Sequence, residues 1–118
     1  MKTLTIGDLK ARIPIIQGGM GVGISLSGLA SAVANEGGIG VISAAGLGLL
    51  YKKLSPSNYT EAGNLGLAEE IRKAREKAKG IIGVNVMVAL SDFAELVKTS
   101  IAEKVDIIVS GAGLPLDF

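Results

Sequence analysis

Apolar residues gather in four short runs along the chain, each rich in isoleucine or valine. The runs cover Pro14–Gln17, Ile39–Ser43, Ile81–Val88 and Asp106–Ser110. None of them alternates cleanly between apolar and polar residues, which is typical of strands covered on both faces. The pattern therefore predicts four buried β-strands.

Between these runs, apolar residues recur with helical spacing in three segments. The segments are approximately Ser27–Glu36, Leu67–Lys79 and Phe93–Lys104. We expect Ser25 or Ser27 to cap the first helix, and Gly37 to take the left-handed position that ends it. Gly80 is expected to end the second helix.

The second and third helices carry further local signals. Glu69–Lys73 and Arg72–Glu76 have the spacing of ion pairs on the exposed side of the second helix. The third helix is expected to begin at a capping box, in which Asp92 is followed three residues later by Glu95. Its buried face is expected to consist of Phe93, Leu96, Val97, Ser100 and Ile101.

Strict alternation of strands and helices predicts a parallel sheet with right-handed crossovers. Either an open doubly wound sheet or part of a closed barrel fits this order. A complete (β/α)₈ barrel takes about 250 residues, so four strands in 118 residues amount to nearly half of one. The longest irregular stretch, Gly46–Asn64, contains Tyr51, Lys52, Lys53 and Tyr59. It is expected to be a solvated insertion, with a lid over the ligand-binding edge as the alternative.

The composition narrows the chemistry. The chain has no cysteine and no histidine, which excludes disulfides, thiolate metal sites and the commonest general base. The formal net charge of +1 attracts neither nucleic acid nor anionic lipid. No apolar run reaches the roughly 20 residues that a membrane span needs. Because Asp8, Lys10 and Arg12 interrupt any signal-peptide core, we expect a cytoplasmic protein without metal, nucleic-acid or membrane partners.

Glycine is concentrated directly after the first predicted strand, where it supplies four of the seven residues of Gln17–Gly23. Without a Cβ, the backbone can approach a planar or anionic ligand. A tight strand-to-helix turn with positive φ would explain the run equally well. A dinucleotide-binding fingerprint does not fit, because its third small residue would fall on Ile24 or Leu116.

All four predicted strands end in small or amide-bearing residues, which would form a shallow floor suited to a flat cofactor such as a flavin. Asn85 is the one strong polar side chain inside an apolar strand. A buried amide without a hydrogen bond costs about 1–3 kcal/mol. Two hypotheses remain for Asn85: it bonds a neighbouring backbone carbonyl, or it bonds a flavin or substrate.

The carboxylates are interpreted as structural. Glu69 and Glu70 lie on a helix and are expected to be solvated. Asp92 and Glu95 are expected to cap a helix, and Asp106 lies at the start of a strand, away from the ligand-binding edge. None of them is expected to act as a general acid or base.

Four ordered motifs resemble the nitronate monooxygenase family, formerly called 2-nitropropane dioxygenase, which includes the FMN-dependent enoyl-acyl-carrier-protein reductases. The motifs are PIIQGGM at 14–20, LASAVANEGGIG at 29–40, GVNVM at 83–87 and SGAGLP at 110–115. The resemblance covers nearly the whole chain. It implies the N-terminal half of a (β/α)₈ TIM barrel: one partial domain over residues 1–118, with four parallel strands and three intervening helices.

The resemblance also implies FMN as the cofactor, and it implies which residues contact it. Gly19, Met20 and Gly21 match the turn whose backbone meets the isoalloxazine ring. Asn85 matches the family asparagine that contacts FMN, and Gly111 belongs to the glycine turn beside ring and substrate. The family's catalytic histidine lies beyond the fourth strand, and its phosphate loops belong to the last two barrel strands. No catalytic residue is therefore assigned, and the isolated chain is expected to be inactive.

The resemblance implies nitronate oxidation, in which reduced flavin meets O₂. The alternative within the family is an FMN-dependent enoyl-acyl-carrier-protein reductase that takes electrons from a nicotinamide cofactor. The rival from another class is a small non-catalytic α/β binding module. Because the first and fourth strands would lack their barrel neighbours, we also expect homo-oligomers through the exposed sheet edges.

Overall fold

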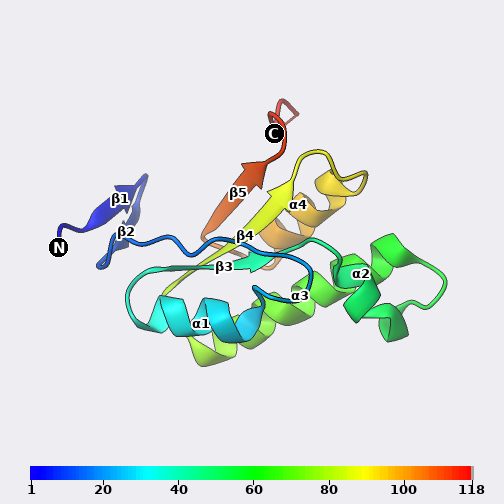
Figure 1. Cartoon of the computed structure of the whole chain (residues 1–118), viewed down its shortest axis with the longest axis horizontal. Helices are drawn as coiled ribbons and strands as arrows, with labels where there is room; N and C mark the ends of the chain where they lie inside the picture. The colour runs from blue at the N-terminus through cyan, green and yellow to red at the C-terminus, as the bar shows by residue number, and fades with distance from the viewer. Residues whose placement is uncertain (118) are drawn as a thin grey trace.

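A three-stranded parallel sheet packed against helices forms the centre of the molecule (Figure 1). The computed structural model describes residues 1–117. Its sheet contains, in spatial order, β3 (Ile39–Ser43), β4 (Ile81–Met87) and β5 (Ile107–Gly111). The main helices are α1 (Ser27–Asn35), α3 (Tyr59–Lys77) and α4 (Phe93–Ala102). Each precedes one strand of the sheet, so the predicted parallel α/β alternation is confirmed.

The first predicted strand, Pro14–Gln17, lies beside β3 without becoming a regular strand. It forms an isolated parallel bridge between Ile16 and Ile39. The Ile15 N–H folds back to the Ile13 carbonyl at 2.8 Å, a three-residue turn centred on the proline, whose ring fixes φ near about −65°. The parallel arrangement is therefore confirmed for three regular strands, and this kinked segment occupies the place of the fourth.

A β-hairpin precedes this segment and was missed by the sequence analysis. β1 (Leu4–Ile6) pairs antiparallel with β2 (Leu9–Ala11). The two-residue turn begins with Gly7 at φ +55°, a backbone conformation that glycine adopts readily in tight hairpins. Ala11 packs with β3 side chains on the sheet face opposite the helices. The hairpin thereby covers the amino-terminal end of that face.

The prediction of an irregular loop over Gly46–Asn64 was wrong, because most of this stretch is helical. It contains α2 (Leu47–Leu50), the 3₁₀ helix η1 (Lys52–Leu54) and the first turns of α3. The side chain of Asn58 accepts a hydrogen bond from the Glu61 N–H at 3.0 Å, which caps α3. The predicted start at Leu67 was therefore too late, although the Asn-x-x-Glu spacing signalled the true one.

The predicted capping interactions were also wrong. Leu26 is the N-cap of α1, and no side chain of its own caps that helix. Asp92 is the N-cap of α4, but its carboxylate makes no capping bond. The predicted left-handed Gly37 is confirmed, with φ +94°.

Other local expectations for the helices need correction. On α3, neither expected i,i+4 ion pair forms; Arg72 instead pairs at 2.6 Å with Glu103, the C-cap of α4, and Lys73 lies 3.6 Å from Glu70. The α3 helix ends at Lys77, before the predicted glycine. On α4, Ile101 was expected to be buried but is 59% exposed. Arg72 thus pairs with a residue on another element, and spacing along one helix does not report such a partner.

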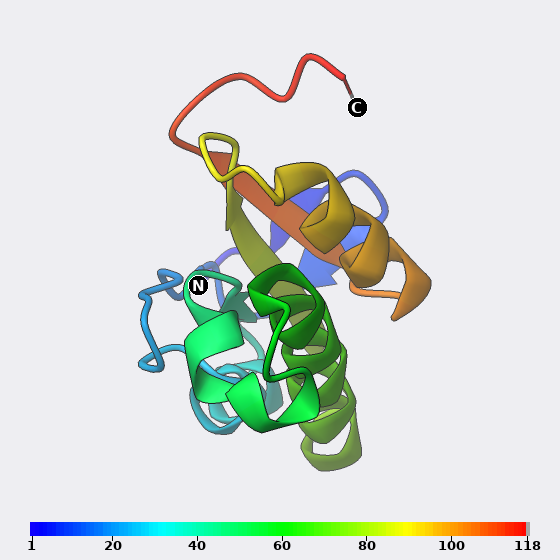
Figure 2. The same cartoon turned by 90° about the vertical axis from the view of Figure 1, so that its right-hand side faces the viewer.

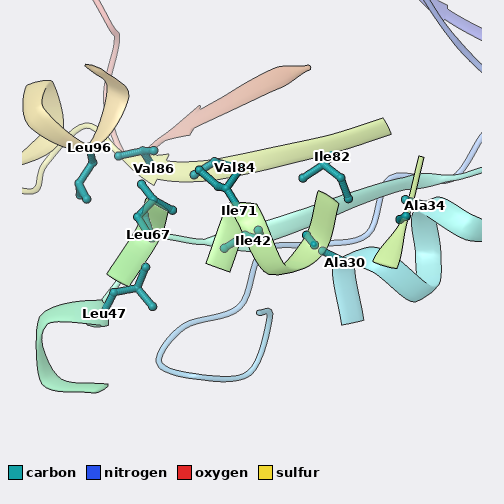
Figure 3. Close-up of a cluster of buried hydrophobic side chains, with 13 residues drawn as sticks. Ala30, Ala34, Ile42, Leu47, Leu67, Ile71, Ile82, Val84, Val86 and Leu96 are labelled. Carbon is teal, nitrogen blue, oxygen red and sulfur yellow. The ribbon is translucent and has the colours of Figure 1, made fainter. Parts of the chain in front are cut away.

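The main core lies between the helices and one face of the sheet (Figure 3). It combines Ile42, Val84 and Val86 of the sheet with Leu67 and Ile71 of α3. α1 packs closely on β3 because position 40 is glycine: a Cβ there would overlap the Ala30 carbonyl oxygen. The opposite sheet face carries the smaller cluster around Ala11, Ile39 and Val41.

Candidate functional site

The carboxyl ends of β3, β4 and β5 meet at one edge of the sheet, which Figure 2 views from that side. Ser43 is paired with Asn85, and Asn85 with Val109. The neighbouring positions Ile42 and Val84 pack toward the helices. Because side chains alternate along a strand, the three paired residues share the face turned away from the helices.

The segment Gly18–Ile24, here called the glycine loop, lies on these strand ends. A Cβ on Gly19 would lie 2.6 Å from the Cβ of Asn85. A Cβ on Gly21 would lie 2.8 Å from the Cβ of Ala45 and 3.1 Å from the hydroxyl of Ser43. These two glycines are therefore required by close approach, and neither has positive φ.

Gln17 joins the glycine loop to the sheet. Its side-chain Nε2 donates to the Val41 carbonyl at 3.0 Å, and its Oε1 accepts from the Val41 N–H at 2.9 Å. The side-chain amide of Gln17 thus makes the two hydrogen bonds to Val41 that the backbone of a neighbouring strand would otherwise make, at the point where the chain turns away from β3. This frees the following residues to turn across the carboxyl edge.

Ser25 holds the glycine loop closed and was missed as a site residue, because sequence reasoning assigned it to helix capping. Its side chain is buried, with 1% exposure. The hydroxyl accepts from the Met20 N–H at 2.9 Å and donates to the Gly18 carbonyl at 3.1 Å. Its backbone N–H donates to the Met20 carbonyl, and its carbonyl accepts from the Ser43 N–H at 2.8 Å. One residue therefore ties both limbs of the loop to β3.

The outer surface of the glycine loop is apolar. Met20, Val22 and Ile24 are between 51% and 63% exposed. Single exposed apolar residues are ordinary, and here three of them belong to one loop at the carboxyl ends of the strands. The backbone of the predicted residue Met20 is therefore hydrogen-bonded to Ser25, while its side chain is exposed to solvent.

Asn85 is half-buried beneath Gly19. Within residues 1–117, its side-chain amide makes no hydrogen bond to another group of the chain. The amide can both donate and accept. It therefore remains available to a ligand at the carboxyl edge.

Gly111, the last residue of β5, lies on the far side of β4 from the glycine loop. It is paired with Met87, and its carbonyl accepts from the Val88 N–H at 2.8 Å. A Cβ at this position would meet nothing within 4 Å. The structure thus brings Gly19 to Asn85 and Gly21 to Ser43 and Ala45, with Met20 between the two glycines, and it places Gly111 beside open space one strand further along.

A buried carboxylate lies behind this edge, so the expectation that Glu70 is solvated was wrong. Glu70 is 4% exposed. It accepts from the Ser27 N–H at 2.9 Å and from the Tyr51 hydroxyl. Burial alone raises the pKa of Glu70, but these hydrogen bonds and the positive charge of Lys73 outweigh it and lower the pKa below its ordinary value.

The hydroxyl of Tyr51 is affected in the opposite direction. Burial, followed by its hydrogen bond to Glu70, raises the pKa of Tyr51 above its ordinary value, and Lys73 opposes this only in part. Tyr51 therefore stays protonated and donates to the carboxylate at neutral pH. The predicted structural role of Asp106 is consistent with its contacts, since it pairs with Arg75 at 2.7 Å and accepts from the Ile82 N–H at 2.9 Å.

Within residues 1–117, no group of three or more histidine, cysteine, aspartate or glutamate side chains is arranged to hold a metal ion. None of the described helices combines the length and the apolar character that crossing a membrane requires.

A glycine loop lying on the carboxyl ends of parallel strands defines the ligand-binding edge of an α/β protein, where barrel and doubly wound enzymes bind cofactors and substrates. The chain belongs to the nitronate monooxygenase family, whose model matches residues 2–113. The sequence-based assignment of family and barrel-type fold is therefore confirmed.

Solved structures show the same likeness. The chain is 30% identical to FabK from Thermotoga maritima, with a TM-score of 0.70 over 89% of this chain and 29% of that one. It is 32% identical to a single-residue mutant of the same FabK, with a TM-score of 0.69 over 88% of this chain and 30% of that one. No curated protein matches. The chain thus spans about 30% of the length of these structures.

Proposed function

We propose that this chain supplies the ring-binding floor of an FMN site in an oxidoreductase that oxidises nitronates. Membership of the nitronate monooxygenase family supports the cofactor and the reaction class. The observation that carries the proposal is the position of Asn85. Its side-chain amide lies under the glycine loop and makes no hydrogen bond within residues 1–117.

The residues at this edge fit a flat aromatic group. Gly19 and Gly21 bring backbone onto the strand ends, where any Cβ would collide with Asn85 or Ala45. Gly111 leaves open space on the other side of Asn85. When bound, FMN supplies the redox chemistry. In this proposal Asn85 orients the ring by a hydrogen bond, and the glycine loop excludes water from its edge.

Proton transfer needs a group that these residues do not provide. The chain has no histidine, so the family's catalytic histidine has no counterpart among its 118 residues. Asn85 is neutral and does not act as a general base at ordinary pH. We therefore expect the 118 residues alone to oxidise nitronates no faster than free FMN does.

FMN titration of the purified chain tests the proposal. Wild type is expected to quench flavin fluorescence on binding, and Asn85→Leu is expected to bind much more weakly while remaining folded. Asn35→Ala is the matched control, because its amide bonds the Lys77 carbonyl at 2.9 Å at the other end of α1. A folded wild-type chain that binds no FMN would contradict the proposal and favour the non-catalytic binding module.

The second candidate is the FMN-dependent enoyl-acyl-carrier-protein reductase, which the sequence motifs also imply. The likeness to FabK over most of this chain favours it. The two reactions differ in their co-substrates. A longer protein containing these residues would consume O₂ with a nitronate in the first case, and a reduced nicotinamide with an enoyl thioester in the second.

A further inference from the structure

Helix α1 begins without a cap from its own sequence. Leu26 occupies the N-cap position and has no polar side chain. Glu70 of α3 supplies the missing acceptor, since its Oε1 accepts from the Ser27 N–H at 2.9 Å. The first N–H groups of a helix are unpaired and carry partial positive charge, so a carboxylate is favourable there. Glu70 thus caps α1 from another helix, at the point where the glycine loop enters it.

The other carboxylate oxygen of Glu70 accepts the hydroxyl of Tyr51, which directly follows α2. The Tyr51 N–H donates to the Leu47 carbonyl at 2.9 Å, which continues the turn of α2. The Tyr51 ring lies against α3, because a Cβ on Gly66 would be 2.5 Å from it. Lys73 also reaches this hydroxyl, at 3.2 Å. Glu70 therefore fixes the end of α2 as well as the start of α1.

The α2 region in turn contacts the glycine loop. A methyl group of Leu50 lies 3.3 Å from the position that a Cβ on Gly23 would take. Gly46, with φ +72°, precedes α2, and a Cβ there would lie 2.6 Å from the methyl groups of Val22. Gly46 and α2 thus pack against the middle of the glycine loop.

We infer that Glu70 is a positioning residue for the glycine loop. By bridging Ser27 and Tyr51, it fixes both the start of α1, which follows the loop, and the end of α2, which packs against the loop. A buried charge is a costly way to join two helices, because desolvation offsets much of its attraction and apolar residues often serve better. A carboxylate does what an apolar side chain cannot, since it accepts from two separate donors. The consequence for flavin binding rests on the proposed function, whereas the consequence for loop position does not.

Hydrogen exchange measures the loop position directly. The amides of Met20 and Ser25 are bonded inside the loop region, so their exchange reports its opening. In Tyr51→Phe and Glu70→Gln these amides are expected to exchange roughly tenfold faster, the scale of losing one helix cap or buried hydrogen bond. The amides of β4 are expected to be unaffected. Glu70→Ala should exceed Glu70→Gln, because glutamine keeps an oxygen acceptor.

Glu69→Gln is the matched control, since Glu69 neighbours Glu70 on α3 but contacts neither Ser27 nor Tyr51 through a hydrogen bond. FMN affinity is measured on the same variants and is expected to fall with loop protection. Loop amides that exchange as in wild type, in variants whose Tm has fallen, would overturn the inference and leave Glu70 a packing residue. If wild type binds no FMN, the proposed function fails while the exchange data still decide this inference. If Glu70→Ala does not fold, Tyr51→Phe decides it, because that change removes only a hydroxyl.

Discussion

Gly19 lies directly against Asn85: a Cβ on the glycine would come within 2.6 Å of the Cβ of the asparagine. The backbone of the glycine loop thus rests on a strand residue whose amide is not used by the rest of the described chain. The contact joins two motifs that are far apart in sequence. Because of this contact, the glycine loop and the carboxyl end of β4 pack together.

The first prediction concerns this contact. Gly19→Ala should displace the glycine loop, because the added Cβ would lie 2.6 Å from the Cβ of Asn85, which is anchored in β4. We expect a stability loss of about 1–3 kcal/mol, typical of overpacking, together with weaker FMN binding. Urea unfolding and flavin titration measure the two effects.

Gly18→Ala is the matched control for that prediction. A Cβ on Gly18 would meet nothing within 4 Å, and the residue does not have positive φ. Both variants add one methyl group to the loop, but only the methyl group at position 19 collides with Asn85. Equal stability of both would show that the loop is free to move away from Asn85.

The second prediction concerns Ser25. Ser25→Ala removes the acceptor of the Met20 N–H and the donor to the Gly18 carbonyl. A typical intramolecular hydrogen bond contributes about 0.5–1.5 kcal/mol, so losing these two part-buried bonds should lower the free energy of unfolding by about 1–3 kcal/mol. Ser31→Ala provides the comparison, because this buried hydroxyl bonds only the nearby Gly28 carbonyl within α1. A Ser25 variant as stable as the Ser31 variant would argue against the proposed closure of the loop.

The parts of the fold that sequence predicted correctly are those set by local pattern. The apolar run Ile39–Ser43 predicted a buried strand, and the structure has one there. Gly37 was predicted to end a helix, and it has the positive φ that this position favours. The glycine loop and Asn85 were likewise found from composition and position. Their contact follows from parallel strands ending at a common edge.

What sequence did not reveal depends on partners distant along the chain. Glu70 looks like a solvated helix residue beside Glu69, and only the packing of α1 and α2 on α3 buries it. Ser25 looks like a helix cap because serine at that place is a common one, yet its hydroxyl serves the preceding loop. The hairpin turn at Gly7 and the cap at Asn58 did carry local signals, and these were overlooked.

The third prediction concerns the dependence of stability on pH. The folded pKa of Glu70 lies below its ordinary value of 4.5. A carboxylate with a lowered folded pKa contributes stability above its unfolded pKa and loses it as pH falls through the folded one. Wild type should therefore lose more stability than Glu70→Gln as pH is lowered below 4.5. Thermal melts of both proteins from neutral to acidic pH give the comparison, with Glu69→Gln as control. Parallel curves for wild type and Glu70→Gln would exclude an ionised Glu70 in the folded state.

The edges of the sheet bear on association. Among residues 1–117, β5 pairs only with β4, and the kinked segment at Pro14–Gln17 pairs only with β3. Ile15 and Ile16 are 54% and 48% exposed. A hollow of about 280 Å³ adjoins this edge and is lined by Ile13, Ile15, Ala32, Val33, Glu36 and Gly38.

We propose, as the fourth prediction, that a protein of these 118 residues self-associates at micromolar concentration. Unpaired strand edges flanked by aliphatic side chains pair with another chain, and two copies related by a two-fold axis would cover both edges of each other. Burying the exposed isoleucines adds about 25 cal/mol per Å² of apolar area. Ile15→Lys should weaken association, because it places a charge at one edge, whereas Leu29→Lys on the exposed side of α1 should not. Sedimentation velocity over a range of concentrations measures this, and a monomer throughout the micromolar range would show that the edges do not drive pairing.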